Sequence, residues 1–310
     1  MTKSVPTSAA TPEQNRPLLG IALAIVAMFF FTNQDAVTKV LIQYLPISTV
    51  VLVRYTAFTL FAFALAAFTG PHASRGVLKS LQSPVRLMHV LRGLLLVYEI
   101  FIFSFGMRHI DLGLQHALFS VFPLIITALA WPLLGERVGP WRWGSVLVGF
   151  IGALVIIRPG LTAFNFYTIF PILAALMYAL YNITTRRTGR SGDSFQTSMV
   201  YLGLVGWLAV LPFGLWQWVT PQGSQIGLLA ILSATSIIGH GCMILALIFT
   251  QASVLQPLNY LLLVFAFCTG FLYFGEIPDL FTVIGGAIIV ASGLFIILRE
   301  RIRAREKALG

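Results

Sequence analysis

Residues 133–160 read LLGERVGPWRWGSVLVGFIGALVIIRPG, and residues 272–300 read LYFGEIPDLFTVIGGAIIVASGLFIILRE. Both stretches begin with Gly-Glu near their start, pass through a turn and continue as a glycine-rich apolar segment that ends near an arginine. Superposing Glu136 on Glu276 gives an offset of 140 residues, close to half of the 310-residue chain. The sequence therefore contains an internal repeat of about half its length.

The composition is that of a membrane protein. The chain is 58% hydrophobic and only 10% charged, with a mean hydropathy of +0.89, whereas soluble proteins carry roughly 25% charged residues. No motif with interleaved basic and aromatic residues indicates nucleic-acid binding. Cys242 and Cys268 lie in apolar runs and are expected to be small core residues.

Ten segments are long and apolar enough to be spans. A bilayer crossing needs about 20 apolar residues, and runs of this length favour helices over barrel strands. The predicted spans are residues 18–43, 46–69, 85–107, 111–134, 140–158, 163–185, 195–219, 225–249, 251–274 and 279–298. The connections between them are too short for a soluble domain.

Five helices per half is an odd number, so the two halves enter the membrane in opposite directions. The predicted fold class is an all-α polytopic membrane protein with ten transmembrane helices as two inverted five-helix repeats. The predicted divisions are a disordered tail (1–16), the two repeats (17–160 and 161–299) and a basic tail (300–310). Inverted repeats are typical of secondary transporters, with the binding site between the halves near the midplane, although a purely structural duplication would give the same pattern.

The positions of Lys and Arg predict the orientation. Fifteen of the 20 basic residues fall in segments that are cytoplasmic if the N-terminus is inside, and only Arg108 and Arg158 fall in outer loops. Both termini are therefore expected in the cytoplasm, with the tail RERIRAREK near anionic lipid headgroups. The polar first 16 residues do not resemble a cleaved signal.

The first span carries an acid and a base one helical turn apart. Asp35 and Lys39 share a helix face. They could form an ion pair that fixes the end of the helix. Alternatively, Asp35 could hold a proton, a cation or the ammonium group of a substrate, because charges inside a membrane usually face the bundle interior and have a function.

Three further charges lie in the second and third spans. Arg92 and Glu99 are seven residues apart and fall on nearly the same helix face. Glu99 is a candidate for reversible protonation, and the alternative is a structural network of Arg54, Arg92 and Glu99 that joins the two helices. Summed over all five groups, the spans carry a net charge of +1, which favours an anionic or zwitterionic substrate.

The repeat offset brings polar and aromatic positions of the two halves to matching depths. It relates His116 to Gln256 and Phe119 to Asn259, and it places a proline, Pro123 or Pro257, in each fourth helix, where a kink is expected. Each histidine could equally be a packed core residue. The candidate substrate-binding or coupling residues are Asp35, Lys39, Arg92, Glu99, His116, Phe119, Tyr178, Tyr181, Asn182, His240, Gln256, Asn259 and Tyr260. Aromatic walls with a few polar anchors suit a planar or amphipathic small molecule.

Other polar and small residues are expected to have structural roles. Glu136 and Glu276 lie at opposite membrane faces and are interpreted as turn or cap residues. The series Ser145, Gly149, Ala153 and the pair Ala287, Ala291 allow close helix contact, within a monomer or between the protomers of a homodimer. No cluster has metal-ligand spacing, and neither a metal nor a cofactor is expected.

The motifs together resemble the EamA-type members of the drug/metabolite transporter superfamily. The resemblance rests on the two repeated blocks, on QDAVTK and VLVRY in the first two spans, and on LRGLLL and SVFPLI in the next two. It implies a bacterial inner-membrane protein that exports or imports small metabolites, such as amino acids, nucleotide-related compounds, vitamins, opine-type metal chelators or drugs. The bacterial subgroup that includes riboflavin and S-adenosylmethionine carriers is the most similar in character.

These features predict a secondary transporter without an ATP site, since no GxxxxGK[ST] loop exists in the chain. We expect it to move a small amphipathic metabolite, amino-acid-like or otherwise zwitterionic or aromatic, by alternating access, with export favoured. Uptake of a compound such as riboflavin or S-adenosylmethionine is the main alternative, and a passive channel is another. An intramembrane enzyme is disfavoured because no nucleophile–base arrangement accompanies the buried charges.

Overall fold

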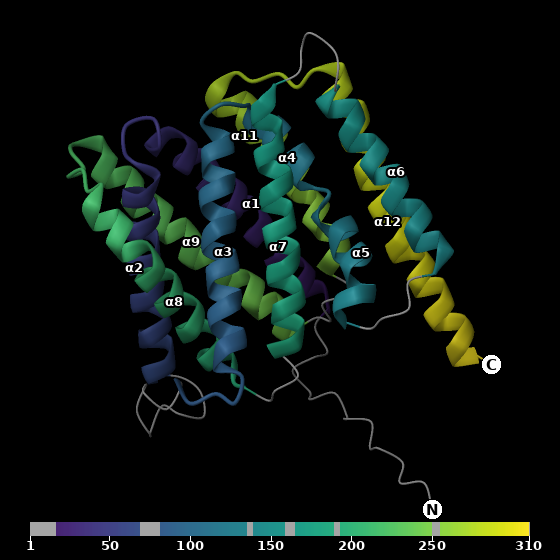
Figure 1. Ribbon diagram of the computed structural model, residues 1–310, viewed down its shortest axis with the longest axis horizontal. Coiled ribbons are helices and arrows are strands. Elements are labelled where there is room, and N and C mark those ends of the chain that lie inside the picture. The colour runs from purple at the N-terminus through teal and green to yellow at the C-terminus, as the bar shows by residue number, and fades with distance from the viewer. Residues whose placement is uncertain are drawn as a thin grey trace, which may run out of the picture.

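The computed structural model describes residues 17–68, 81–134, 139–158, 165–188, 193–249 and 255–309, which form a bundle of roughly parallel and antiparallel helices (Figure 1). No strand occurs within these ranges. Seven helices are long and apolar enough to cross a membrane, and three shorter apolar helices accompany them. The all-helical, ten-span membrane fold expected from the sequence is confirmed.

The helices follow the predicted spans to within a few residues at most ends. The first half contains α1 (Pro17–Leu41), α2 (Ile47–Phe68), α3 (Arg86–Met107), α4 (Leu112–Phe119), α5 (Phe122–Leu134) and α6 (Pro140–Ile157). The second half contains the 3-10 turn η4 (Phe166–Thr168), α7 (Ile169–Thr188), α8 (Phe195–Trp216), α9 (Ser224–Phe249), the 3-10 turn η5 (Gln256–Tyr260), α11 (Leu261–Phe274) and α12 (Leu280–Leu309). The last helix continues beyond the predicted span at residue 298 and includes most of the basic tail.

The fourth span of each half is interrupted at the same place. In the first half α4 ends at Phe119 and α5 begins at Phe122, directly before Pro123. In the second half η5 ends at Tyr260 and α11 begins at the next residue. Proline lacks the N–H that would continue the helix, so the predicted irregularity near both prolines is confirmed.

The packing repeats between the halves. Helix α1 of the first half packs along α9, and its counterpart α7 packs along α3 in the same way. The second and fifth spans pack against their own counterparts: α2 against α8, and α6 against α12. Two inverted halves related by a pseudo-twofold axis in the membrane plane require such reciprocal packing.

Helices α6 and α12 stand side by side at one edge of the bundle (Figure 1). A Cβ atom added at Gly152 would lie 2.8 Å from the carbonyl oxygen of Gly285, so only glycine allows this backbone approach. Ser145, Gly149 and Ala153 of the predicted small-residue series are buried. The second predicted pair is not part of this contact, because Ala287 and Ala291 are exposed.

Candidate functional site

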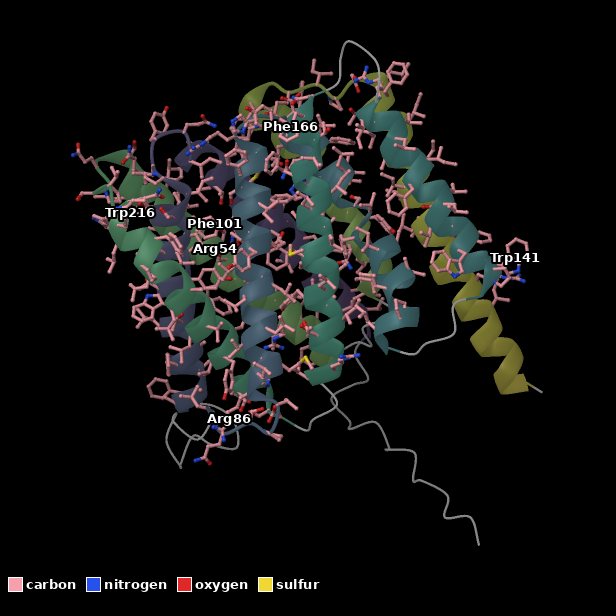
Figure 2. The ribbon with its side chains drawn as sticks, viewed as in Figure 1. Arg54, Arg86, Phe101, Trp141, Phe166 and Trp216 are labelled. Carbon is pink, nitrogen blue, oxygen red and sulfur yellow. The ribbon has the colours of Figure 1, made fainter. Side chains whose placement is uncertain are left out.

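Three charged side chains lie at a common depth in the bundle. Below, "outer end" means the end that contains Leu41, Ile47 and Met107, which the charge bias predicts to be extracytoplasmic. At a rise of 1.5 Å per residue, Asp35 lies about 9 Å, Arg54 about 10 Å and Glu99 about 12 Å along their helices from that end. Figure 2 shows Arg54 near mid-height, away from Arg86 at one end and Phe166 at the other. We call this region the central layer.

Asp35 lies beside a histidine. His116 Nε2 of α4 is 3.2 Å from Asp35 Oδ2 of α1, which is an ion pair when the imidazole is protonated. The angles do not meet those of a hydrogen bond, and His116 is 3% exposed. The edge of the Phe103 ring packs on the imidazole with centroids 5.3 Å apart. The structure therefore brings together two of the predicted residues, Asp35 and His116.

An aromatic cluster extends from His116 to the second half of the chain. Phe119 lies 5.5 Å from Tyr178 of α7, and Phe122 lies 4.9 Å from the same ring. Tyr178 in turn stacks near Tyr181, at 5.7 Å. The predicted residues Phe119, Tyr178 and Tyr181 thus form a continuous aromatic surface across the contact between the halves.

A second group lies around Arg54 on α2, α1 and α9. With the amide of Gln34 oriented by its hydrogen bonds, its oxygen accepts from the two terminal nitrogens of Arg54 at 3.1 and 2.9 Å, and its nitrogen donates to Ser236 Oγ. His240 packs near this group, with its ring 4.9 Å from Phe31 and 5.4 Å from Phe58. His240 is therefore surrounded by aromatic rings of the first half.

Glu99 lies between these groups. It is 8% exposed, and no hydrogen bond or ion pair among the described residues involves it. The charges that act on it are those of Asp35 and Arg54. A carboxyl group without a fixed partner in such a position suits reversible protonation.

Lys39 is not paired with Asp35, so the first of the two alternatives, an ion pair within α1, is not formed. Lys39 Nζ instead forms an ion pair with Glu276 and donates to the carbonyl oxygen of Ile110 at 2.9 Å. Glu276 Oε2 accepts from the Leu112 N–H at 2.7 Å, at the start of α4. The geometry fits the interpretation of Glu276 as a cap residue, and it uses Lys39 as a tie between α1, α4 and the α11–α12 connection. Glu136 lies outside the described residues.

Arg92 does not join Glu99, so the alternative of a structural network of Arg54, Arg92 and Glu99 is not formed among the described residues. Both terminal nitrogens of Arg92 donate to Ser198 of α8, one to the hydroxyl and one to the carbonyl, each at 2.8 Å. The neighbouring His89 lies 3.0 Å from Asp193. Arg92 therefore fixes the opposite, inner end of the bundle.

The remaining predicted residues lie outside the central contacts or outside the described part of the chain. Tyr260 is 5% exposed, and its hydroxyl packs against the backbone of Gly293 in α12. The Asn182 amide donates to the carbonyl of Tyr178 within its own helix at 2.8 Å. Asn259 lies in η5, and the side chain of Gln256 is outside the described part of the chain.

The separation of these groups changes the charge argument. The sequence-based sum of +1 combined groups at different depths. With Lys39 neutralised by Glu276 and Arg92 at the inner end, Asp35, Arg54 and Glu99 remain, and they carry −1 when both carboxyl groups are ionised. The central layer therefore favours a zwitterion, a cation or a bound proton over an anion.

A shallow depression opens at the outer end. It has a volume of about 150 Å³. Among the residues that line it are Asp111, Arg158, Phe267, Glu276 and Asp279. Arg158 forms an ion pair with Asp279. Within the described ranges, no group of three or more His, Cys, Asp or Glu side chains is placed to hold a metal ion.

The prediction omitted Gln34, Tyr55, Phe103 and Ser236, which contact or adjoin the central charges. Gln34 and Ser236 are polar residues inside apolar spans, and this signal was available in the sequence. The hydrogen bond between Gln34 and Ser236 could not be read from the sequence, because 202 residues separate them.

Comparison with known proteins gives relatives along the whole chain. A Riboflavin transporter of Vibrio cholerae is 30% identical over 95% of this chain and 98% of its own length. An S-adenosylmethionine uptake transporter of Rickettsia prowazekii is 27% identical, with 92% and 94% covered. A Pseudopaline exporter of Pseudomonas aeruginosa is 25% identical, with 88% and 94% covered.

The fold also occurs in a solved crystal structure. That chain is 19% identical, with a TM-score of 0.62 over 92% of this chain and 96% of its own. The sequence profile of one family matches residues 18–158 and again residues 165–299, so each half carries the family pattern. The chain belongs to the EamA-like transporter family.

Proposed function

We propose that this chain is a secondary transporter of the bacterial inner membrane that carries a small amphipathic metabolite by alternating access between its two halves. The observation that carries the proposal is the central layer. Asp35, Arg54 and Glu99 lie at one depth, beside the interrupted fourth spans, and ionisable groups at such a position are usually part of a substrate or proton path.

The substrate is proposed to combine a positively charged group with a planar one. Asp35 would bind the ammonium group or the coupling proton, and the His116 imidazole lies beside its carboxylate. The rings of Phe103, Phe119 and Tyr178 offer faces for stacking and for cation–π contact. Two kinds of relative are named for compounds with planar ring systems, S-adenosylmethionine and riboflavin. These two compounds are the first to test.

The direction of transport is a separate question. The sequence analysis favoured export, and one relative is named an exporter. Several relatives are named uptake transporters. Uptake is therefore the direction that we propose to measure first.

The test is transport by the purified full chain in proteoliposomes. Vesicles preloaded with unlabelled S-adenosylmethionine, riboflavin or an aromatic amino acid are diluted into the labelled compound. Saturable uptake that is accelerated by preloading is expected for one of them. Uptake that does not saturate and does not respond to internal substrate would indicate a channel, and no flux for any compound would refute the proposal.

A further inference from the structure

Arg54 is a cation held in the bundle by a neutral group. Its terminal nitrogens bind the amide oxygen of Gln34, and the described residues place no carboxylate within 4 Å of it. Lys39 and Arg158, nearer the outer end, each have a carboxylate partner. A neutral amide can orient a guanidinium but does not neutralise it, and the charge of Glu99 acts on Arg54 without a contact within 4 Å.

The orientation is fixed by buried groups from three helices. Gln34 is 3% exposed and Ser236 is 1% exposed. The hydrogen bond between them connects α1 to α9, and the amide then presents its oxygen to Arg54 on α2. One acceptor atom occupies the two terminal nitrogens on one side, while a guanidinium has five N–H donors.

Arg54 also lines a small cavity. The cavity has a volume of about 20 Å³, enough for about one water molecule. It is lined by Arg54, Tyr55, Phe58, Leu96, Ile100, Leu202 and His240. Tyr55 is 4% exposed, and its hydroxyl has no hydrogen-bond partner within the described ranges. A buried hydroxyl without a partner costs free energy unless a ligand or water completes it.

We propose that Arg54 and Tyr55 form a binding site for the carboxylate group of the transported metabolite. The proposal rests on the transport function above and narrows the substrate to an amino-acid-like zwitterion. The guanidinium supplies charge and the phenol supplies a hydrogen bond, which is the donor set that a carboxylate requires. Asp35 lies at a similar depth on α1 and binds the amino group. The cavity beside Arg54 and Tyr55 is the space into which the carboxylate group fits.

The experiment compares two probes that differ in one group. S-adenosylmethionine carries an α-carboxylate, and decarboxylated S-adenosylmethionine lacks it; riboflavin is a third, carboxylate-free probe. Dissociation constants are measured on the purified full chain and on Arg54→Gln. The wild type is expected to bind the carboxylate probe roughly 10-fold or more tightly than the decarboxylated one. Arg54→Gln is expected to reduce this ratio to about 1 while binding the decarboxylated probe as before.

Two milder variants keep the test meaningful if Arg54→Gln fails to fold. Gln34→Glu supplies Arg54 with a fixed carboxylate and should weaken only the carboxylate probe. Tyr55→Phe removes a single hydroxyl and should do the same by a few-fold. Arg86→Gln, at the exposed inner end of α3, is the matched control and should leave the ratio unchanged.

Four outcomes decide the proposal. Loss of the ratio in Arg54→Gln supports it. An equal loss for both probes overturns it, because Arg54 would then be structural. A wild-type ratio near 1, or binding of riboflavin without binding of the carboxylate probe, also overturns it and leaves transport intact. Absence of both binding and flux for all probes refutes the proposed function itself.

Discussion

The outer end and the central layer of the bundle both contain acidic and basic side chains, but the two regions satisfy their charges differently. At the outer end Lys39 pairs with Glu276 and Arg158 with Asp279, while Arg108 donates to the backbone carbonyls of Ile42 and Leu45. In the central layer Arg54 is held by an amide and Glu99 by no fixed partner. Charges that neutralise one another can hold helices in place. Charges without such a partner remain available to a ligand or a proton.

The largest effect is expected from Asp35→Asn. The amide keeps the size of the side chain and removes its charge, so the carboxylate that faces His116 Nε2 at 3.2 Å and any ion pair with a substrate ammonium are lost. Transport should fall by roughly 100-fold, the scale of one to two lost charge-assisted contacts, with thermal stability unchanged. The assay is proteoliposome uptake, and Asp279→Asn is the matched control. Wild-type rates in Asp35→Asn would remove Asp35 from the mechanism.

A smaller effect is expected from Glu99→Gln. If Glu99 exchanges a proton during the cycle, the variant should transport about 10-fold more slowly, within the range for a lost proton-transfer group. Its rate should also vary less with pH than that of the wild type. The measurement is initial uptake rate from pH 5 to pH 8, with circular dichroism to show that the helices persist. An unchanged pH profile would assign Glu99 a packing role.

Lys39→Met is expected to act on stability more than on transport. It removes the ion pair of the Glu276 side chain, which is 13% exposed in the structure. Breaking a buried ion pair by removing one partner lowers the free energy of unfolding by roughly 3 kcal/mol. The thermal unfolding temperature in detergent should fall, and Lys39→Arg should restore much of it. A loss of transport at unchanged stability would place Lys39 on the substrate path and weaken the contrast between the two regions.

The smallest effect is expected from Asp279→Asn. Partial burial would raise the pKa of Asp279, but hydrogen bonds from Thr282 and the charge of Arg158 outweigh it and hold the pKa below its usual value. The contribution to stability is therefore present above the unfolded pKa and is lost as pH falls through the lowered value. Because the Asp279 side chain is 45% exposed, the free energy of unfolding at neutral pH should change little in the variant. A large change would show that the outer ion pair stabilises the bundle.

The spans were predictable because apolar length and loop chemistry are local properties. The interruption of the fourth span in each half also followed from the sequence, since Pro123 and Pro257 remove a helical donor wherever the chain folds. The α12 helix was underestimated because its basic end, beyond the apolar stretch, is still a good helix former.

The partners of the charged residues were less predictable. Asp35 and Lys39 share a helix face, and this spacing suggested a pair. In the folded chain each meets a partner elsewhere, Asp35 with His116 of α4 and Lys39 with Glu276 in the α11–α12 connection. Spacing along a helix indicates which side chains of that helix can meet. It does not indicate whether a side chain 237 residues away in the sequence will be the preferred partner.

The sequence by itself determined a ten-span membrane protein with an internal repeat, and it identified a small set of intramembrane charges. The hydrophobic effect and backbone hydrogen bonding act on each span separately, so these properties can be read along the chain. Only the tertiary structure decided which charges neutralise one another and which stay free. That choice depends on contacts between different elements of the fold, within one half and across both, and it separates the outer ion pairs from the central layer where Asp35, Arg54 and Glu99 lie.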